Sequence, residues 1–247
     1  MKARKLFRKY VASLLKRYYI LTSNGYSVGK AYGARFLLDW RHSLDKKVEV
    51  ELYEHDQITY LCRMIDILKP DMFIDIGSHA ALYAIIAKSR LATLEVHAFE
   101  PDRTNLCQLY ANLFINKMEK LINVHEHGLS NNSDFVKFDT AESTTSRGTR
   151  RISSTGDIEI QVRRLDDIIK CNEKIIVVKV DVEGHEKQVL DGARTLLARN
   201  QCLLQIESFT DDFDALKDLM ATMDYRHIMT INDYYFSNIS EIPDAQQ

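Results

Sequence analysis

The feature that most constrains the fold is an alternation of short apolar runs with longer stretches of helical spacing between residues 55 and 206. The apolar runs are followed by glycine or acidic residues and cover residues 72–76, 94–99, 121–125, 175–180 and 202–206. Apolar strands that alternate with helices are typical of a mainly parallel sheet covered on both faces. We therefore expect an α/β fold with helices on both faces of the sheet.

Helical spacing is clearest over residues 55–68, where the pattern stops at Pro70, and further helices are expected over residues 82–91, 104–117 and 186–199. The end of the chain differs. Residues 225–231 and 234–237 are both strand-like and are separated only by a tight turn. Two strands so close together must pair antiparallel.

Residues 139–157 hold nine Ser and Thr, two Gly and three Arg, a composition that does not build a core. We expect a mobile loop that acts either as a solvated insertion or as a lid over a substrate. Its Arg147, Arg150 and Arg151 suit recognition of a carboxylate, phosphate or sulfate.

The first 38 residues carry nine Lys and Arg and no carboxylate, so a formal net charge of −2 leaves −11 for the remainder. Residues 22–34 hold three of the nine glycines and are expected to be a linker. The chain would then divide into a basic helix with its linker (1–38) and a main domain (39–247). On a helical wheel, residues 1–21 have an apolar face and an opposite basic face, made of Phe7, Tyr10, Val11, Leu14, Tyr18 and Leu21 against Lys2, Lys5, Lys9 and Lys16.

Such a helix either docks on the acidic body of its own domain or makes peripheral contact with an anionic membrane. No run approaches the ~18 apolar residues that span a bilayer, and the start lacks a secretory pattern. The four cysteines stand far apart, which disfavours disulfides and a structural metal. We expect a cytoplasmic protein that contacts at most the inner membrane face. The acidic remainder disfavours a nucleic-acid partner.

Ligands of open α/β sheets bind beyond the carboxyl ends of the strands. The first strand ends in Asp75-Ile76-Gly77-Ser78-His79, where Gly77 lets the backbone approach a ligand. Glu100 ends the next strand, where an acidic residue accepts hydrogen bonds from ribose hydroxyls. A dinucleotide site needs further glycines for its pyrophosphate, and His79 and Ala81 stand there instead. An adenosine ligand without pyrophosphate indicates S-adenosylmethionine rather than a nicotinamide cofactor.

Several motifs in this order are similar to those of the FkbM-type class I methyltransferases. They are Ile74-Asp75-Ile76-Gly77, Phe99-Glu100-Pro101, Arg164-Leu165-Asp166-Asp167-Ile168 and Asp181-Val182-Glu183-Gly184-His185-Glu186 with Val189-Leu190-Asp191-Gly192-Ala193. The resemblance covers about residues 70–210, and the terminal hairpin also fits it. It implies a Rossmann-like, seven-stranded, mostly parallel sheet with an antiparallel last strand, and S-adenosyl-L-methionine as cofactor.

The resemblance also implies positions for the cofactor. Asp75, Gly77, Ser78 and His79 would border its methionine part, and Glu100 its ribose. Asp102 or Arg103, together with the Gly128-Leu129 turn, would lie near the adenine. The family's usual Asp-x-Gly-Ala-Asn-x-Gly differs here, because His79 replaces the asparagine and Ala81 the second glycine.

Asp181, Glu183 and Glu186 form an acidic group after the fourth strand, and Glu207 follows the fifth. Side chains two residues apart at a strand end point the same way, so Asp181 and Glu183 are expected to face the crevice. Crowded carboxylates have raised pKa values or require a cation, such as a sulfonium, a substrate amine or Mg²⁺. We assign no metal ligands.

Methyl transfer requires an acceptor oxygen aligned with the S–CH₃ bond and removal of its proton. We expect Asp181, Glu183 and His185 to carry the chemistry, with Asp181 as base and His185, His79 or His127 as alternatives. The preferred function is O-methylation of a hydroxyl on a sugar, glycan or other small natural product. Two alternatives remain: N-methylation, favoured by an acidic pocket that holds an amine, and a catalytically silent binding module.

Overall fold

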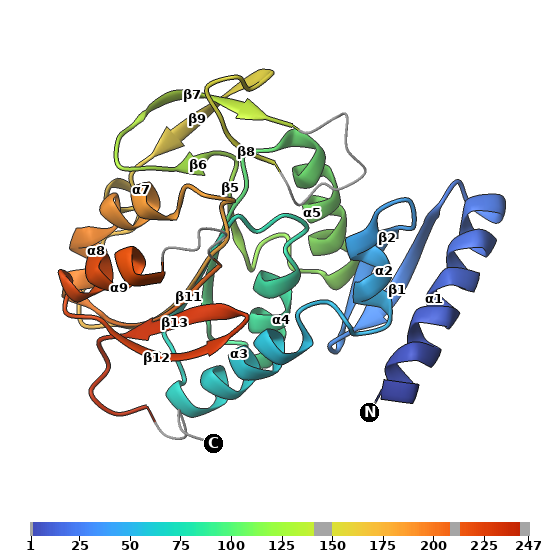
Figure 1. The fold of residues 1–247 in the computed structure, drawn as a ribbon, viewed down its shortest axis with the longest axis horizontal. Helices are drawn as coiled ribbons and strands as arrows, with labels where there is room; N and C mark the ends of the chain where they lie inside the picture. The colour runs from blue at the N-terminus through green and yellow to red at the C-terminus, as the bar shows by residue number, and fades with distance from the viewer. Residues whose placement is uncertain (1, 141–149, 208–212, 243–247) are drawn as a thin grey trace.

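The centre of the protein is a seven-stranded sheet of order β12-β13-β11-β10-β3-β4-β5 (Figure 1). The structure, a computed structural model, describes residues 2–140, 150–207 and 213–242. Strand β13 pairs antiparallel with β11 and β12, and the other neighbouring pairs are parallel, as predicted. The strands are β3 (Met72–Ile76), β4 (Glu95–Phe99), β5 (Asn123–His125), β10 (Ile175–Val180), β11 (Gln201–Ile206), β12 (Arg226–Ile231) and β13 (Asp233–Ser237).

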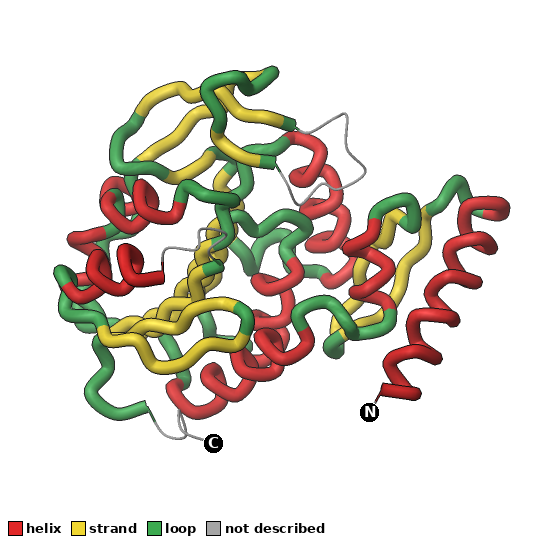
Figure 2. The backbone as a smooth tube through the Cα atoms, in the orientation of Figure 1, coloured by secondary structure: helices red, strands yellow, loops and turns green. Residues whose placement is uncertain are grey.

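Helices cover both faces of this sheet (Figure 2). Successive strand residues alternate between two apolar clusters, so that Phe73 packs on one face and Ile74 on the other. The first cluster includes side chains of α3 (His55–Leu68), α4 (Leu82–Arg90) and α5 (Arg103–Asn116). The second includes side chains of α6 (Leu165–Ile168), α7 (Glu186–Asp191), α8 (Arg194–Arg199) and α9 (Phe213–Ala221).

The single helix expected over residues 186–199 is two helices, α7 and α8, which meet at Gly192-Ala193. A Cβ at Gly192 would lie 2.0 Å from the Ser130 carbonyl oxygen, so the chain approaches another backbone closely here. The Gly192 carbonyl also leaves the helical pattern to accept the Asp166 N–H at 3.0 Å. This tertiary contact interrupts a helix that the apolar spacing alone predicts.

The linker expected over residues 22–34 is a wrong prediction. Helix α1 (Lys2–Thr22) leads into an antiparallel hairpin of β1 (Tyr26–Ala31) and β2 (Ala34–Asp39). The hairpin is anchored on α5, because Leu37 N–H donates to Asn112 Oδ1 at 2.7 Å and Gln108 Nε2 donates to the Leu37 carbonyl at 2.8 Å. Phe36 and Leu38 join the first apolar cluster. The short helix α2 (Ser43–Glu49) follows.

Helix α1 docks on its own domain, but not through the apolar face that the helical wheel suggests. Ala12 is buried, Leu15 packs against the first cluster, and Tyr19 stacks on Trp40 with ring centroids 5.2 Å apart. Of the predicted apolar face, the residues Tyr10, Leu14, Tyr18 and Leu21 are exposed. None of the helices in the described ranges is long and apolar enough to cross a membrane.

A second sheet of order β6-β9-β7-β8 lies beside the carboxyl ends of the central strands (Figure 1). Its strands are β6 (Gly128–Leu129), β7 (Asp134–Asp139), β8 (Arg151–Ile152) and β9 (Ile158–Arg163). Much of the expected loop over residues 139–157 falls at 141–149, outside the described residues. Its flanks are not loop throughout, because β8 pairs with β7 and a small cluster of Phe138, Ile160 and Val162 packs beneath them.

Candidate active site

A cavity of about 440 Å³ lies where the turns after β3, β4, β10 and β11 meet the second sheet. Parallel strands bring their carboxyl ends to one edge, which is why these turns converge. Eight of the predicted site residues line it: Gly77, His79, Glu100, Gly128, Leu129, Asp181, Glu183 and His185. Asp75 and Ser78 line a smaller adjoining cavity of about 50 Å³, and Asp102 lines neither.

Gly77 lies where the turn after β3 (the first turn) contacts the turn after β10 (the fourth turn). Its φ is +80°, and a Cβ there would lie 1.8 Å from the Asp181 carbonyl oxygen. The Asp181 N–H donates to the Ile76 carbonyl at 2.9 Å from the neighbouring strand. No side chain fits between these two turns, so glycine at this position is required by backbone approach as well as by φ.

The rest of the first turn has a left-handed backbone at two of the positions where this chain departs from the family pattern. His79 has φ +48° and Ala81 has φ +60°. Asparagine and glycine adopt this region more readily than histidine and alanine. Asp75 supports the turn from below: it is 1% exposed and accepts the Ala84 N–H at 3.1 Å. Burial raises the pKa of Asp75 to about 7.

Glu100 is buried at the end of β4 and links two turns. Its Oε2 accepts the His79 N–H at 2.9 Å and its Oε1 accepts the Asp102 N–H at 2.8 Å. Burial raises the pKa of Glu100 to about 8. At neutral pH the side chain therefore holds a proton, so one oxygen can donate a hydrogen bond to a ligand hydroxyl in the cavity and the other can still accept one.

Asp102, predicted to lie near adenine, caps α5 instead. Its Oδ1 accepts the Asn105 N–H at 2.8 Å and is paired with Arg150. The Asp102 side chain is 3% exposed and that of Arg150 10%. This buried ion pair ties the chain entering β8 to the start of α5, and it brings Arg150 to the cavity wall.

Asp181 lies between a buried ammonium and a second carboxyl group. Lys179 Nζ donates to Asp181 Oδ2 at 2.5 Å, and Glu207 forms a hydrogen bond with Asp181 from the end of β11. Although burial raises the pKa of Asp181, the Lys179 ammonium lowers it below its usual value. Burial and the Asp181 carboxylate raise the pKa of Glu207 to about 10. At neutral pH, Asp181 is therefore ionised and Glu207 holds a proton.

The fourth turn brings two further predicted residues to the cavity. Burial, together with the nearby Asp181 and Glu186 carboxylates, raises the pKa of Glu183 to about 7. His185 Nε2 lies 3.0 Å from Ser130 Oγ, and burial lowers the pKa of His185. Glu186 Oε1 accepts the Gly184 N–H at 2.9 Å, so it shapes the turn rather than facing the cavity. His127 does not line the cavity.

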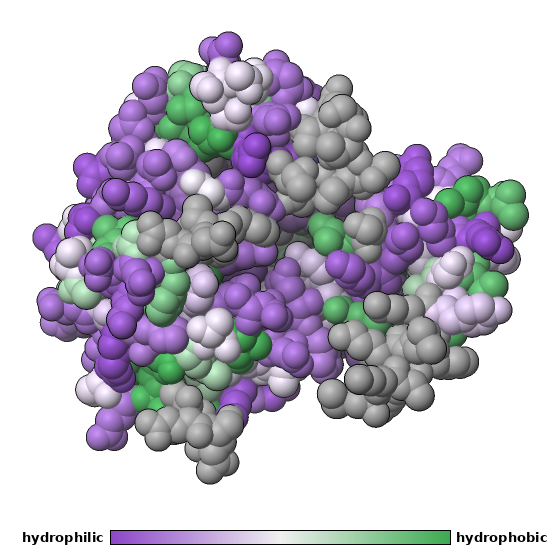
Figure 3. All heavy atoms as spheres, viewed as in Figure 1, coloured by the Kyte–Doolittle hydropathy of each residue, from purple (hydrophilic) through white to green (hydrophobic). Residues whose placement is uncertain are grey.

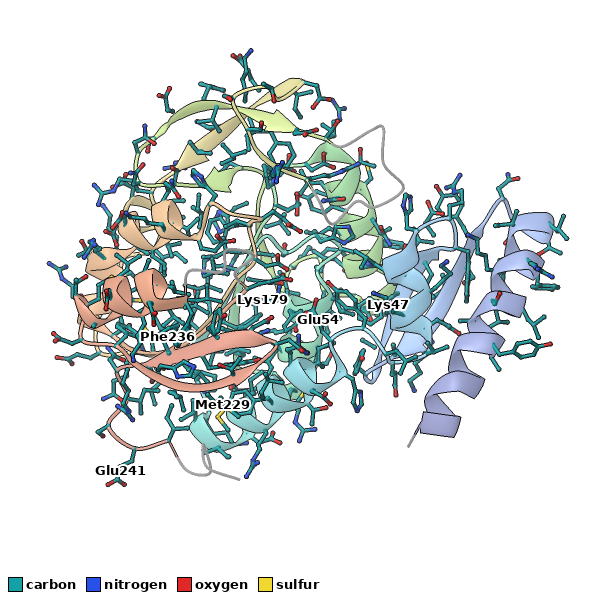
Figure 4. The ribbon with its side chains drawn as sticks, viewed as in Figure 1. Lys47, Glu54, Lys179, Met229, Phe236 and Glu241 are labelled. Carbon is teal, nitrogen blue, oxygen red and sulfur yellow. The ribbon has the colours of Figure 1, made fainter. Side chains whose placement is uncertain are left out.

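Three residues that support Asp181 from behind, Glu54, Tyr83 and Lys179, were not predicted from the sequence. Tyr83 O–H donates to Glu54 Oε2 at 2.5 Å, and Lys179 Nζ lies 4.7 Å from the Tyr83 ring centroid. Figure 4 labels Glu54 and Lys179 near the middle of the molecule, with Lys47 towards the N-terminal part. Lys179 could have been predicted to belong to the site, because a lysine within an apolar strand such as residues 175–180 is buried and needs a buried acidic partner. Glu54 carries no such signal in its polar surroundings.

The residues present fit a ligand with ribose hydroxyls and a positive charge. Five carboxyl groups line the cavity against two cations: Glu54, Glu100, Asp181, Glu183 and Glu207 against Lys47 and Arg150. Glu100 and Glu207 hold protons at neutral pH, because burial raises the pKa of Glu100 to about 8 and that of Glu207 to about 10. A sulfonium therefore suits the ionised Asp181, and Glu100 suits hydroxyl groups. Among the described residues, no group of three or more His, Cys, Asp or Glu side chains is arranged to hold a metal ion.

The fold and this cavity define the class of S-adenosylmethionine-dependent methyltransferases, and comparisons with known proteins agree. The model of the methyltransferase FkbM domain matches residues 75–227. Hexuronic acid methyltransferase AglP of Haloferax volcanii is 30% identical over 150 residues, which are 60% of this chain and 60% of AglP. The chain thus spans 60%, less than two thirds, of the length of that relative.

Solved structures that are similar to this one are more distant in sequence. A SAM-dependent methyltransferase from Agrobacterium tumefaciens is 12% identical with a TM-score of 0.50, over 86% of this chain and 69% of that one. Methyltransferase FkbM from Methylobacillus flagellatus KT is 20% identical with a TM-score of 0.48, over 78% and 54%. Because the family match covers more than half of its residues, this chain belongs to the FkbM methyltransferase family. The predicted family and cofactor are confirmed.

Proposed function

We propose that this protein transfers a methyl group from S-adenosylmethionine to a sugar hydroxyl, with a hexuronic acid as the acceptor class. The observation that carries the proposal is the shared cavity, which joins Glu100 at one turn to the Asp181 and Glu207 pair at another. AglP, the hexuronic acid methyltransferase, supports the acceptor class through its 30% identity.

In this proposal the turns after β3, β4 and β5 hold the cofactor, which supplies an electrophilic methyl group when bound. Glu100 exchanges hydrogen bonds with ribose hydroxyls. The Gly77-Ser78-His79 turn borders the methionine part, and Gly128-Leu129 lies beside the adenine. Asp75 and Asp102 act indirectly, because each uses its oxygens to fix the start of a helix.

Asp181 is the proposed base. Lys179 keeps it ionised, so that Asp181 would accept the proton of the acceptor hydroxyl as its oxygen is methylated. The bound cofactor would supply the methyl group, and its sulfur would keep the electron pair of the broken S–CH₃ bond. Glu207 holds its own proton at neutral pH and orients Asp181 through their hydrogen bond. Because Glu207 is neutral, it places no second negative charge beside Asp181.

The variant Asp181→Asn tests this role. We expect kcat to fall by about 10²–10⁴-fold, with the Kd for S-adenosylhomocysteine nearly unchanged. Glu119→Gln, which alters an exposed carboxylate that does not line the cavity, is the control for charge. Normal kcat in Asp181→Asn with intact cofactor binding contradicts the assignment.

The carboxylate of the acceptor requires a cation, and Lys47 and Arg150 are the two that line the cavity. Lys47 is exposed on α2, which makes it accessible to a sugar. We expect Lys47→Met to raise the KM for methyl glucuronide about tenfold, as the loss of a charge-assisted hydrogen bond predicts. The KM for methyl glucoside, which lacks the carboxylate, should not change.

Radioactive methyl transfer to a panel of methyl glucuronide, methyl glucoside and glucosamine separates the acceptor classes. Preference for the glucuronide supports the proposal. Transfer to the glucosamine nitrogen instead supports N-methylation and overturns it.

A further inference from the structure

Exposed apolar side chains are concentrated at one end of the protein. Most of the large apolar residues that are exposed in the described chain lie between residues 10 and 28. On α1, Leu14 is 49% exposed and Leu21 is 85% exposed, and Tyr10 and Tyr18 are 64% and 59% exposed. Figure 3 shows hydrophobic atoms at the right-hand end of the molecule, where α1 lies. Such a gathering marks an interaction site.

These four residues lie on one face of α1, opposite the face that docks. Successive residues of an α-helix are separated by about 100°. Positions 10, 14, 18 and 21 therefore fall within one quadrant. Ala12, Leu15 and Tyr19, which pack against the domain, fall on the other side. One face of α1 is therefore bound to the domain, and a second, apolar face is exposed to solvent.

The surroundings of this face are positively charged. Residues 1–38 contain nine Lys and Arg and no carboxylate. Arg17 on α1 is exposed, and its spacing of three and four residues from Leu14 and Leu21 places it beside this face. Lys16 lies on the docking side instead, beside Lys46 of α2. An anionic partner would complement the charge of Arg17. A symmetric contact with a second copy would instead bring two such basic segments together.

We propose that the outward face of α1, defined by Tyr10, Leu14, Tyr18 and Leu21, binds the surface of an anionic lipid membrane. Leucine side chains enter the boundary between headgroups and acyl chains, and tyrosine rings suit the same depth. Arg17, which is exposed beside this face, contacts lipid phosphates. The helix lies in the plane of the membrane, and the catalytic domain stays in water.

The test uses the full chain and sedimentation with two kinds of vesicle, phosphatidylcholine alone and phosphatidylcholine mixed with phosphatidylglycerol. We expect binding to the mixed vesicles only, and its loss in concentrated salt, which screens the phosphates. The variant Leu14→Gln/Leu21→Gln should reduce the partition coefficient by at least about tenfold. Its matched control is Phe114→Gln/Leu121→Gln, which removes two apolar side chains that are 70% and 50% exposed elsewhere.

The outcomes separate the partners. Loss of binding in the α1 variant but not in the control supports the proposal, provided that both variants unfold cooperatively at the wild-type temperature. No sedimentation of the wild-type protein with the mixed vesicles overturns it, and so does equal binding by the two variants. Concentration-dependent dimers that only the α1 variant abolishes, without vesicle binding, overturn it in favour of a second copy.

Discussion

Gly77 lies where the turn after β3 contacts the turn after β10, so the geometry of both turns depends on this residue. Gly77→Ala places a Cβ against the Asp181 carbonyl and also imposes a left-handed φ on alanine. We expect a loss of about 1–2 kcal/mol in unfolding free energy from φ and about 1–3 kcal/mol more from the steric clash. Chemical denaturation measures both.

Gly33→Ala separates these two effects. Gly33 has φ +86° with open space around a Cβ, so this variant should show the φ cost alone. Equal losses in the two variants would mean that the turns after β3 and β10 can move apart, contrary to the account of the site.

Glu100 is predicted to give the stability a pH dependence. Because burial raises its pKa from the usual 4.5 to about 8, the folded protein binds this proton more tightly than the unfolded chain. The contribution is fully present below pH 4.5 and is lost as the pH rises through 8. Between these values, the unfolding free energy of Glu100→Gln should fall less steeply than that of the wild type, by up to about 1.4 kcal/mol per pH unit.

Urea denaturation at several pH values provides the measurement, with Glu119→Gln as a control at an exposed carboxylate. Parallel pH profiles for the wild type and Glu100→Gln would contradict a protonated, buried Glu100.

At the residue scale, the sequence predicted which side chains follow the strands, but not how their charges are divided. Asp181 and Glu183 were found because two carboxylates stand at a strand end. That Asp181 is ionised and Glu207 protonated depends on Lys179 and on burial, which arise only when β10 and β11 pair. Asp102 was placed near the adenine from the family resemblance, whereas its cap of α5 is a local hydrogen bond and its pairing with Arg150 arises only in the fold.

At the scale of elements, the pair of Arg150 and Asp102 joins the second sheet to α5. Arg150→Met leaves Asp102 buried without its cation, so we expect a loss of about 3–5 kcal/mol in unfolding free energy. The control is Arg90→Met, which breaks the exposed pair with Asp66 and should cost about 0–1 kcal/mol. Calorimetric unfolding of both variants measures the difference, and similar small losses would argue against the anchoring role.

The elements that sequence reasoning found are those with long periodic patterns, such as α3, or with continuous apolar runs, such as β10. The second sheet was missed although β9 alternates apolar and polar residues at period two. The hairpin of β1 and β2 was missed for another reason. Its glycines indicated a break, whereas its stability comes from α5, which lies some 75 residues away along the chain.

For the whole molecule, the hairpin belongs to the main core, and this can be tested by truncation. A chain that starts at residue 23 should still fold, with a lower melting temperature, because it loses the stacking of Tyr19 on Trp40. A chain that starts at residue 40 also loses the buried Phe36 and Leu38. Each such loss costs about 3 kcal/mol, against a total stability of about 5–15 kcal/mol.

Circular dichroism during heating distinguishes the two chains. We expect a cooperative transition for the first and none for the second. A cooperative transition in the chain that starts at residue 40 would contradict this account. It would support instead the domain boundary after residue 38 that the sequence predicted.

The central claim is that the cavity binds S-adenosylmethionine through the turns that carry Gly77 and Glu100. Isothermal titration of the full chain with S-adenosylhomocysteine tests it most directly, with NADH as the control ligand. We predict one site for S-adenosylhomocysteine, no binding of NADH, and an increase in Kd of at least about tenfold in Glu100→Gln. Absence of binding by the wild type, or an unchanged Kd in the variant, would contradict the account.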